Sequence, residues 1–459
     1  MFRKKVGSLS VLWILAIALL IELLPGLSIR AGEAAQGDLL SLPPYVGMPT
    51  ESSVLVNLVA GERDISCRVR FRRADREKKE WSFSEKLAMK ANDIADLRLS
   101  GLESGTRYVY EVLAGTDGTE TTVAEGGFKT RMVRPDKFSF ALFSDSHITP
   151  AAPERSGVLG RVADAIAFRQ PDFAIALGDN IQALCKTHGG PFVSPEGPRI
   201  SYSYYRQSLR HLPSEMALFN VIGNWEGENG WHPEDARGWA RETRMRMVPG
   251  PGAQSYPEGG SPDGGYYAFT WGDVLFVALH ATGYTRTNHA LGSLEGKADD
   301  WTLGDRQMAW LTECLKASHA RWKLIFTHHT EGGRAGDDVN SRYGRGGALA
   351  AHVGEQGKIH ELMQKYGVQA FFYGHDHVFT FQEADGIPYI CVGSAGAPWK
   401  FTSDETGYPW SMPDSGFVWV DVDGKRMNLS FVTPDSAVQG GRELKHYEIK
   451  QAITRSTTK

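Results

Sequence analysis

Five short apolar segments of this 459-residue chain are each followed closely by Asp, Asn or His. Apolar runs of this length are typical of buried strands, and in α/β sheets ligands bind at the carboxyl ends of the strands. Polar side chains from all five segments are therefore expected to meet at one site. They are Asp145 and His147 after residues 138–143, Asp179 after 173–177, Asn224 after 216–222, His328 after 323–327, and His375 and His377 after 370–373.

The seven side chains offer two carboxylates, one amide oxygen and four imidazoles, and no thiolate. Such a mixture of oxygen and imidazole ligands suits Mn, Fe, Zn or Ni better than Ca or a cysteine-type structural zinc. If Asp179 bridges, the seven residues supply eight bonds, four to each of two ions. Two ions about 3.5 to 4 Å apart turn a bound water into hydroxide and hold both the attacking and the leaving oxygen of an in-line displacement. The sequence therefore predicts phosphoester hydrolysis by a metal-activated hydroxide.

The elements that must position these residues follow an α/β pattern, because the strand-like segments alternate with segments whose apolar residues recur at helical spacing. Two Gly- and Pro-rich stretches, 182–199 and 227–265, lack periodicity. They are expected to be loops that carry substrate contacts, since loops of that length in a compact domain are usually functional. The predicted helices include residues 158–168, 305–318 and 358–366.

Residues 42–131 have a different pattern, in which short segments of alternating polarity are separated by turn residues. This pattern predicts an all-β sandwich. The stretch from Leu99 to Tyr110 resembles the corner segment of fibronectin type III domains, in which a Tyr hydrogen-bonds back across the sandwich. No catalytic residues are apparent here, so a packing or spacer module is expected, joined to the rest of the chain by a linker at 132–136.

Residues 1–34 have the three parts of a secretory signal: a basic start at 3–5, an apolar run at 9–21, and small residues before the expected cleavage point. The apolar run of about 13 residues is shorter than the roughly 20 that a membrane-crossing helix needs. The alternative is an uncleaved membrane anchor through residues 9–29, where the apolar character resumes. In both cases the folded part is expected to be secreted, periplasmic or at the cell surface.

Composition narrows the function classes further. The chain is 41% hydrophobic and 23% charged, which excludes an intrinsically disordered chain and a polytopic membrane protein. Its formal net charge of −4 gives no basic footprint for nucleic acid, so a small-molecule phosphoester is the expected partner. The four cysteines form neither a disulfide framework nor a paired CxxC zinc signature.

The order DxH, GD, GN, HH and GHxH along the chain resembles that of the calcineurin-like metallophosphoesterase superfamily. With the sandwich in front and Gly393–Ala397 after the last motif, the chain is similar to the purple acid phosphatase group. The resemblance implies a four-layer α/β/β/α metallophosphoesterase sandwich over 137–449, preceded by a small all-β fibronectin-like sandwich over 42–131. It also implies two divalent or trivalent ions, Fe, Mn or Zn. One ion is expected on Asp145, His147, Asp179 and His377, and the other on Asp179, Asn224, His328 and His375.

The sequence departs from the purple acid phosphatase pattern at three positions. Gln182 stands where a purple enzyme has the Tyr that colours its ferric iron, so a purple centre is not expected. His147 stands where those enzymes have a small residue that binds no metal, which favours the metal pair of the broader superfamily. Trp225 replaces the His of the family pattern GNH[DE], which contacts the substrate phosphate and helps to protonate the leaving group. Trp donates one N–H bond but exchanges no proton near neutral pH.

Three interpretations of Trp225 remain open. Another histidine supplies the proton, with His232, His280 and His329 as candidates and His232 favoured because it follows Trp225 by seven residues. Alternatively, the enzyme acts without a general acid on substrates whose leaving groups depart unaided, or the protein binds metal and an anionic ligand with little or no turnover. The expected catalytic residues are Asp179, His232 and His329, and the expected substrate contacts are Asn224, Trp225 and Arg334.

The other seven of the 14 histidines share no pattern, so surface or packing roles are expected for them. Asp376 lies between two expected ligands and is expected to be structural. The seven background histidines are His188, His211, His289, His319, His352, His360 and His446.

Overall fold

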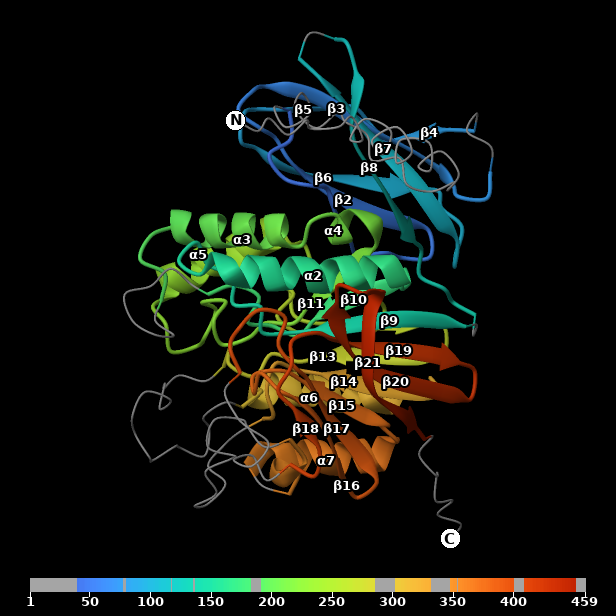
Figure 1. Cartoon of the computed structure of the whole chain (residues 1–459), viewed down its shortest axis with the longest axis vertical. Helices are drawn as coiled ribbons and strands as arrows, with labels where there is room; N and C mark the ends of the chain where they lie inside the picture. The colour runs from blue at the N-terminus through green and yellow to red at the C-terminus, as the bar shows by residue number, and fades with distance from the viewer. Residues whose placement is uncertain are drawn as a thin grey trace, which may run out of the picture.

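The N-terminal part of the chain, blue to cyan in Figure 1, is all β. The computed structural model describes residues 39–76, 80–116, 118–134, 137–182, 191–284, 302–331, 347–352, 354–399 and 408–450. Buried and half-buried residues alternate along the third strand, because one face of it packs on the core. One sheet contains β1 (Tyr45–Gly47), β2 (Ser53–Val59) and β6 (Ile94–Ser100), and the other contains β3 (Ile65–Arg73), β4 (Ser82–Phe83), β5 (Leu87–Met89), β7 (Arg107–Gly115) and β8 (Thr121–Lys129).

Two tyrosines of β7 make hydrogen bonds that anchor this region, one of them to the turn before the strand rather than across the sandwich. The Tyr108 hydroxyl accepts a hydrogen bond of 3.0 Å from the backbone N–H of Glu103, in the turn that precedes its strand. The next inward-facing tyrosine, Tyr110, donates a hydrogen bond of 3.0 Å to the carbonyl of Ser214, which lies in the helical layer beneath the all-β region. The strand therefore holds its own turn with one tyrosine and the neighbouring helical layer with the other.

The rest of the chain builds two mixed sheets. In the first, with the order β11-β10-β9-β19-β20-β21, the three strands that precede the first expected ligands are parallel neighbours. In the second, with the order β12-β13-β14-β15-β17-β16-β18, β13, β14, β15 and β17 are parallel. The first sheet comprises β9 (Phe138–Phe143), β10 (Phe173–Ala176), β11 (Ala217–Asn220), β19 (Phe417–Asp423), β20 (Arg426–Asp435) and β21 (Val438–Ile449); the second comprises β12 (Tyr267–Trp271), β13 (Val274–Ala278), β14 (Trp322–Phe326), β15 (Ala370–Tyr373), β16 (Phe379–Ala384), β17 (Ile387–Val392) and β18 (Ser411–Met412).

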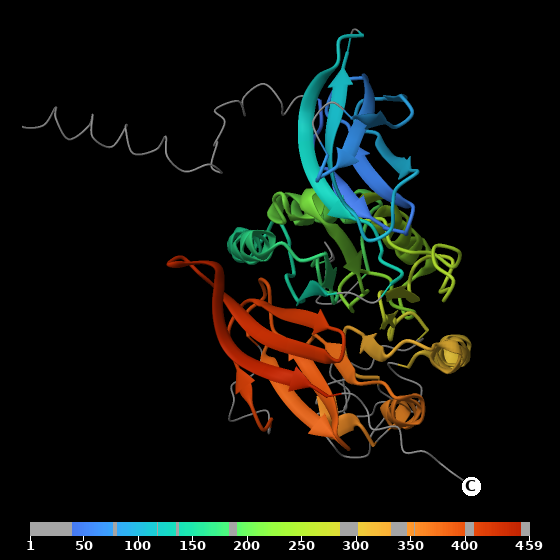
Figure 2. The same ribbon diagram turned by 90° about the vertical axis from the view of Figure 1, so that its right-hand side faces the viewer.

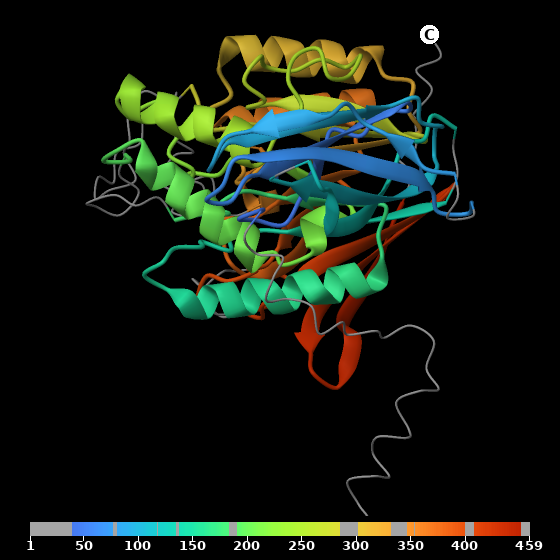
Figure 3. The ribbon, with the colours of Figure 1, turned by 90° about the horizontal axis from the view of Figure 1, so that it is seen from above.

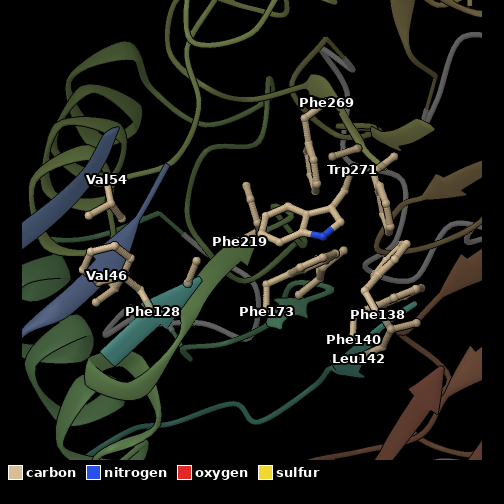
Figure 4. Packing of buried hydrophobic residues seen from close by; sticks show 14 of the residues in the cluster. Val46, Val54, Phe128, Phe138, Phe140, Leu142, Phe173, Phe219, Phe269 and Trp271 are labelled. Atoms are coloured by element: carbon tan, nitrogen blue, oxygen red, sulfur yellow. The ribbon is translucent and has the colours of Figure 1, made fainter. Parts of the chain in front are cut away.

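The two sheets face each other through aromatic side chains. Phe219 stacks on Phe269 with ring centroids 4.3 Å apart, and the Phe173 and Trp271 rings are 4.6 Å apart (Figure 4). The Phe173 and Phe276 rings are 5.3 Å apart. Rings of this size bury a large apolar area and interlock in offset and edge-on pairs. This shared core fixes the two sheets relative to each other, and with them the strand ends that carry the polar residues.

Helices cover the outer face of each sheet. Figures 2 and 3 show α2 on one side of the paired sheets and α6 on the other, with the strands between them. The predicted four-layer α/β/β/α arrangement, with an all-β region in front, is thus confirmed. Among the described residues, no helix is both long and apolar enough to span a bilayer. The helices are α2 (Pro153–Arg169), α3 (Glu196–Ser208), α4 (Leu212–Glu215) and α5 (Glu234–Met247) on the first side, and α6 (Gly304–Ala317), the 3-10 turn η1 (Gly347–Ala350) and α7 (Gly354–Tyr366) on the second.

The expectation of a loop over 227–265 was wrong in part, because α5 runs through the middle of that stretch. Its buried face consists of two alanines, one methionine and Arg244. Arg244 pairs with the buried Glu228 carboxylate at 3.1 Å, so a charged residue occupies an inward position. A helix that buries small and charged residues shows almost no apolar periodicity, which is why the sequence pattern did not reveal it.

A buried arginine joins the all-β region to the helical layer. The Arg206 side chain on α3 is inaccessible to solvent. Its guanidinium donates to the Asn57 side-chain oxygen at 2.6 Å and to the Pro43 carbonyl at 2.6 Å, both in the all-β region, and to the Met247 carbonyl at 3.0 Å. Burial lowers the pKa of Arg206 to about 10, so the group is still protonated at neutral pH.

We expect Arg206→Ala to be strongly destabilising. The substitution leaves three acceptors without this donor, two of them buried and the Pro43 carbonyl partly buried, and each buried one costs about 1 to 3 kcal/mol. The free energy of unfolding should therefore fall by about 3 kcal/mol or more, measured by urea denaturation. Arg206→Lys should recover only part of the loss, because an ammonium cannot reproduce the planar guanidinium fork. An unchanged denaturation midpoint for Arg206→Ala would contradict this role.

Candidate metal centre

The loops after β9, β10, β14 and β15 bring two groups of side chains together. Within each group the ligand atoms lie within 4.8 Å of one another, and all six residues are buried. In the first group, Asp145 Oδ1 is 3.1 Å from His377 Nε2 and 3.6 Å from His147 Nε2. The two groups are Asp145, His147 and His377, and Asp179, His328 and His375.

Asp179 connects the two groups. Its Oδ2 lies 3.0 Å from His328 Nε2, within its own group, and 3.2 Å from His147 Nε2, in the other. Its second oxygen, Oδ1, accepts a hydrogen bond of 2.8 Å from the backbone N–H of Trp225, which fixes the carboxylate. The carboxylate therefore presents one oxygen to both groups while its backbone contact holds the other.

Several buried ligand atoms in this centre make no contact with hydrogen-bond geometry in the described part of the chain, and their near neighbours are other ligand atoms. They come from a carboxylate of each group, an imidazole and an amide. Buried polar atoms are nearly always hydrogen-bonded, so a set of converging exceptions needs a partner of another kind. Oxygen and imidazole nitrogen are the donors that divalent cations bind, and the residues present therefore fit a pair of ions. These atoms are Asp145 Oδ1, Asp179 Oδ2, His147 Nε2 and Asn224 Oδ1.

The glycines that precede Asp179, Asn224 and His375 lie where there is no room for a side chain. A Cβ on Gly223 would lie 2.4 Å from both the backbone nitrogen and Oδ1 of Asp179. A Cβ on Gly374 would lie 2.6 Å from Asp145 Oδ2. Real Cβ atoms essentially never approach so closely, so the motifs GD, GN and GH let the strand ends pack against each other's side chains.

Left-handed backbone conformations concentrate in this centre. Ten non-glycine residues of the described chain have positive φ, and five of them are members of the two groups, with φ between 46° and 68°. Such a conformation costs a non-glycine residue about 1 kcal/mol or more and persists only where the surroundings impose it. The five residues are Asp145, His147, Asp179, His375 and His377.

Sequence comparison identifies the fold that carries this centre. A family model for calcineurin-like phosphoesterases matches residues 138–379, more than half of the chain. The chain belongs to the calcineurin-like phosphoesterase family. The resemblance inferred from the five motifs is thereby confirmed, and the protein is a metal-dependent phosphoester hydrolase. No curated protein matches the full sequence significantly.

Solved structures with the same fold cover nearly all of the chain. The structure of PhoD superposes with a TM-score of 0.69 at 14% identity, covering 90% of this chain and 91% of that one. A purple acid phosphatase from yellow lupin (Lupinus luteus) seeds gives 0.65 at 15% identity, covering 90% of this chain and 75% of that one. At such low identity these similarities establish the fold, which includes the all-β region in front of the phosphoesterase body.

Ring nitrogens on the far side of the phosphoesterase centre are held by backbone carbonyls. His328 Nδ1 lies 2.8 Å from the Leu177 carbonyl, and His377 Nδ1 lies 2.6 Å from the Pro398 carbonyl. These contacts turn Nε2 of each ring toward the carboxylates, as is usual for metal-binding imidazoles. Burial alone would lower the pKa of His328, but the Asp179 and Asp145 carboxylates raise it to about 9. The centre is therefore strongly favourable to positive charge.

Glu226 is a residue of the phosphoesterase centre that the sequence analysis did not single out. Its buried carboxylate accepts hydrogen bonds from the backbone N–H groups of Gly223 at 2.8 Å, Asn180 at 2.7 Å and Asp179 at 3.1 Å. Burial, with a contribution from the Asp179 charge, raises the pKa of Glu226 to about 7. Glu226 thus ties two strand ends together, and the acidic position of the pattern GNH[DE] was the signal that could have found it.

Trp225 lies against the phosphoesterase centre. Its side chain is buried, and its ring meets the His147 ring edge-on with centroids 5.5 Å apart. Gln182, three positions after Asp179, accepts a hydrogen bond from Arg155. The indole therefore packs on one of the expected metal ligands, and the Gln182 amide is engaged by a guanidinium.

The three candidate proton donors are all buried but differ in their surroundings. The His329 ring is 5.3 Å from the His375 ring, and burial together with His328 lowers its pKa to about 3. His280 lines a cleft of about 610 Å³ bordered by α5 and the 227–265 stretch, and burial lowers its pKa to about 4. His232 Nδ1 lies 3.3 Å from the Gly227 carbonyl, in the loop that begins at Asn224.

Other predicted features are outside the centre or outside the described residues. Asp376 is buried and accepts a hydrogen bond from the Tyr408 hydroxyl, in agreement with a structural role. Cys67, Cys314 and Cys391 are buried free thiols, and Cys185 lies outside the described residues. Arg334 also lies outside them, as do residues 1–34 with the expected secretory signal.

Proposed function

We propose that the protein is an exported phosphoesterase with two metal ions, which hydrolyses phosphomonoesters or diesters. The observation that supports this proposal most strongly is the position of Asp179 Oδ2, which lies within 3.2 Å of an imidazole nitrogen from each of two buried ligand groups. We further propose that residues 137–449 form the catalytic domain and residues 42–131 a fibronectin-like packing module. Export rests on the composition of residues 1–34.

The ligand set follows from the two groups. Asp145, His147 and His377 would hold one ion, with Asp179 shared between both. Two ions held there, as Fe, Mn or Zn, would supply Lewis acidity that activates a water and offsets the charge of the transferred phosphoryl group. The second ion would be held by Asp179, Asn224, His328 and His375.

The chain itself would position the substrate around this centre. Asn224 Oδ1 is buried without a hydrogen bond from the described residues, at the mouth of the loop that leads to His232. That loop is closed by two internal hydrogen bonds, from Asn229 Nδ2 to the Asn224 carbonyl at 2.8 Å and from the His232 N–H to the Asn229 carbonyl at 3.0 Å. These bonds tie His232 to the segment that begins at Asn224 and Trp225, and we propose that His232 protonates the leaving group. The Trp225 indole would pack beside the phosphate.

Turnover tests the proposal. Full-length protein loaded with Mn should hydrolyse a nitrophenyl phosphate monoester, a nitrophenyl diester, or both, and chelation should abolish the activity. Metal-loaded protein that binds inorganic phosphate but hydrolyses neither ester would overturn the enzyme and favour a metal-dependent binding protein. That alternative is motivated by Trp225 alone, since the indole cannot exchange a proton.

A series of esters with different leaving groups tests His232. A general acid contributes about 10²- to 10⁴-fold, and it matters most for leaving groups that depart poorly unprotonated. We expect His232→Ala to slow hydrolysis of alkyl esters by about this factor and to have little effect on nitrophenyl esters. His319→Ala, at an exposed histidine outside the centre, serves as the control. If the wild type and His232→Ala depend equally steeply on leaving-group pKa, His232 is not the acid.

A further inference from the structure

Two histidines expected to have only surface or packing roles meet a carboxylate on the outer side of the second sheet. His352 follows η1, His360 lies on α7, and Asp385 lies in the turn between β16 and β17. His360 Nε2 is 3.1 Å and His352 Nε2 is 3.5 Å from the same oxygen, Asp385 Oδ2. The ligand atoms of all three residues lie within 4.8 Å of one another. Three separate elements thus deliver donor atoms to one point.

We propose that His352, His360 and Asp385 bind a third divalent cation of the zinc class, separate from the phosphoesterase centre. Zinc binds imidazole nitrogen and carboxylate oxygen at about 2.0 to 2.2 Å, so tetrahedral ligands lie about 3.3 to 3.6 Å from one another. The observed separations of 3.1 and 3.5 Å from Asp385 Oδ2 are close to that spacing. The fourth position would hold water, since His352 and Asp385 are both exposed.

The surroundings hold these donors in a form suited to a metal. His360 is buried, and its Nδ1 contacts the Tyr389 hydroxyl at 2.9 Å, which orients Nε2 toward Asp385. Gln364 Nε2 donates to Asp385 Oδ2 at 3.2 Å and fixes the carboxylate from the other side. Outer contacts of this kind accompany metal-binding imidazoles and carboxylates.

The position of the site suggests a bracing role. Strand β15 ends at Tyr373 and β16 begins at Phe379, so the loop between them carries His375 and His377. An ion at the third site would tie α7, which precedes β15, to the turn that follows β16. It would therefore hold the elements on both sides of that loop without contacting the phosphoesterase centre.

Zinc stoichiometry tests the site. Full-length wild type, His352→Ala, Asp385→Asn and the control His319→Ala are dialysed against the same free zinc concentration and analysed for bound zinc. Both site variants should bind one ion fewer per chain than the wild type and the control, and zinc should raise their melting temperature less. Zinc at the phosphoesterase centre is common to all four proteins and cancels in the comparison.

The variants are chosen to fold. His352 is exposed, and Asn keeps the shape of Asp385 while tolerating its left-handed φ of 51°. Equal zinc content in the wild type and both variants would overturn the third site. The two histidines would then contact Asp385 without binding a metal ion. A loss of zinc in His319→Ala as well would also contradict it, because the loss would not be specific to these residues.

Discussion

Asp179→Asn should abolish phosphoester hydrolysis. Asn keeps the volume of the side chain and tolerates the left-handed backbone at this position, where φ is 50°. It replaces the charged oxygen that lies 3.0 Å from His328 Nε2 and 3.2 Å from His147 Nε2. We expect kcat/KM for a nitrophenyl ester to fall by at least about 10³-fold, equivalent to about 4 kcal/mol of lost transition-state stabilisation.

Metal analysis shows whether that loss has the proposed cause. The variant should also retain fewer ions per chain than the wild type after dialysis, because the replaced oxygen lies within 3.2 Å of an imidazole nitrogen from each group. Asp423→Asn is the matched control, since its carboxylate pairs with Lys137 at 2.8 Å at the exposed end of β19. Full activity in Asp179→Asn would exclude the bridging role.

Gly223→Ala should disable the centre through a single methyl group. Gly223 does not have a positive φ, so alanine meets no backbone strain and the effect is purely steric. Its Cβ would lie 2.4 Å from the Asp179 backbone nitrogen and from Oδ1. Displacing a catalytic group by about 1 Å can cost about 10²-fold in rate, and overpacking costs about 1 to 3 kcal/mol of stability. We expect both losses, in kcat/KM and in melting temperature.

Gly238→Ala provides the comparison for that substitution. Gly238 lies in α5, and a Cβ there has no atom within 4 Å. Because alanine is the better helix former by about 1 kcal/mol, this variant should keep full activity and melt slightly higher. If Gly223→Ala behaved in the same way, close packing of the strand ends would not be what positions Asp179.

The chemistry of the site was predictable because it lies at strand ends. Each of the five runs between 138 and 373 is short and mostly apolar, and the residues that follow them all carry oxygen or imidazole groups that can bind metal ions. The pattern can therefore be recognised without knowledge of the fold. The same reasoning expects Asp145 and Asp179 at one site, and in the structure the strands that precede them are parallel neighbours. The residue pattern did not predict that the five apolar segments are divided between two sheets. That prediction came only from the family resemblance.

Other features could not be predicted, for physical reasons that differ. The contacts of Glu226 with three backbone N–H groups follow from the packing of the strand ends, so only the acidic position of the family pattern GNH[DE], and no spacing rule, pointed to this residue. The helix α5 buries alanines and Arg244, so its inward face has no apolar stripe. His352 and His360 approach Asp385 only through the packing of α7 against a distant hairpin, and no spacing along the chain reports such a contact.

Arg206 has a consequence for how the molecule unfolds. The sequence changes character near residue 132, which suggests two independent parts. Arg206 nevertheless donates hydrogen bonds to residues on both sides of that boundary. The Tyr110 hydroxyl also donates a hydrogen bond across it. Separating the parts would expose buried acceptors on each, so neither part can open alone without a large penalty. We therefore expect one cooperative unfolding transition, in which the all-β region and the phosphoesterase region unfold together despite the change in sequence pattern between them.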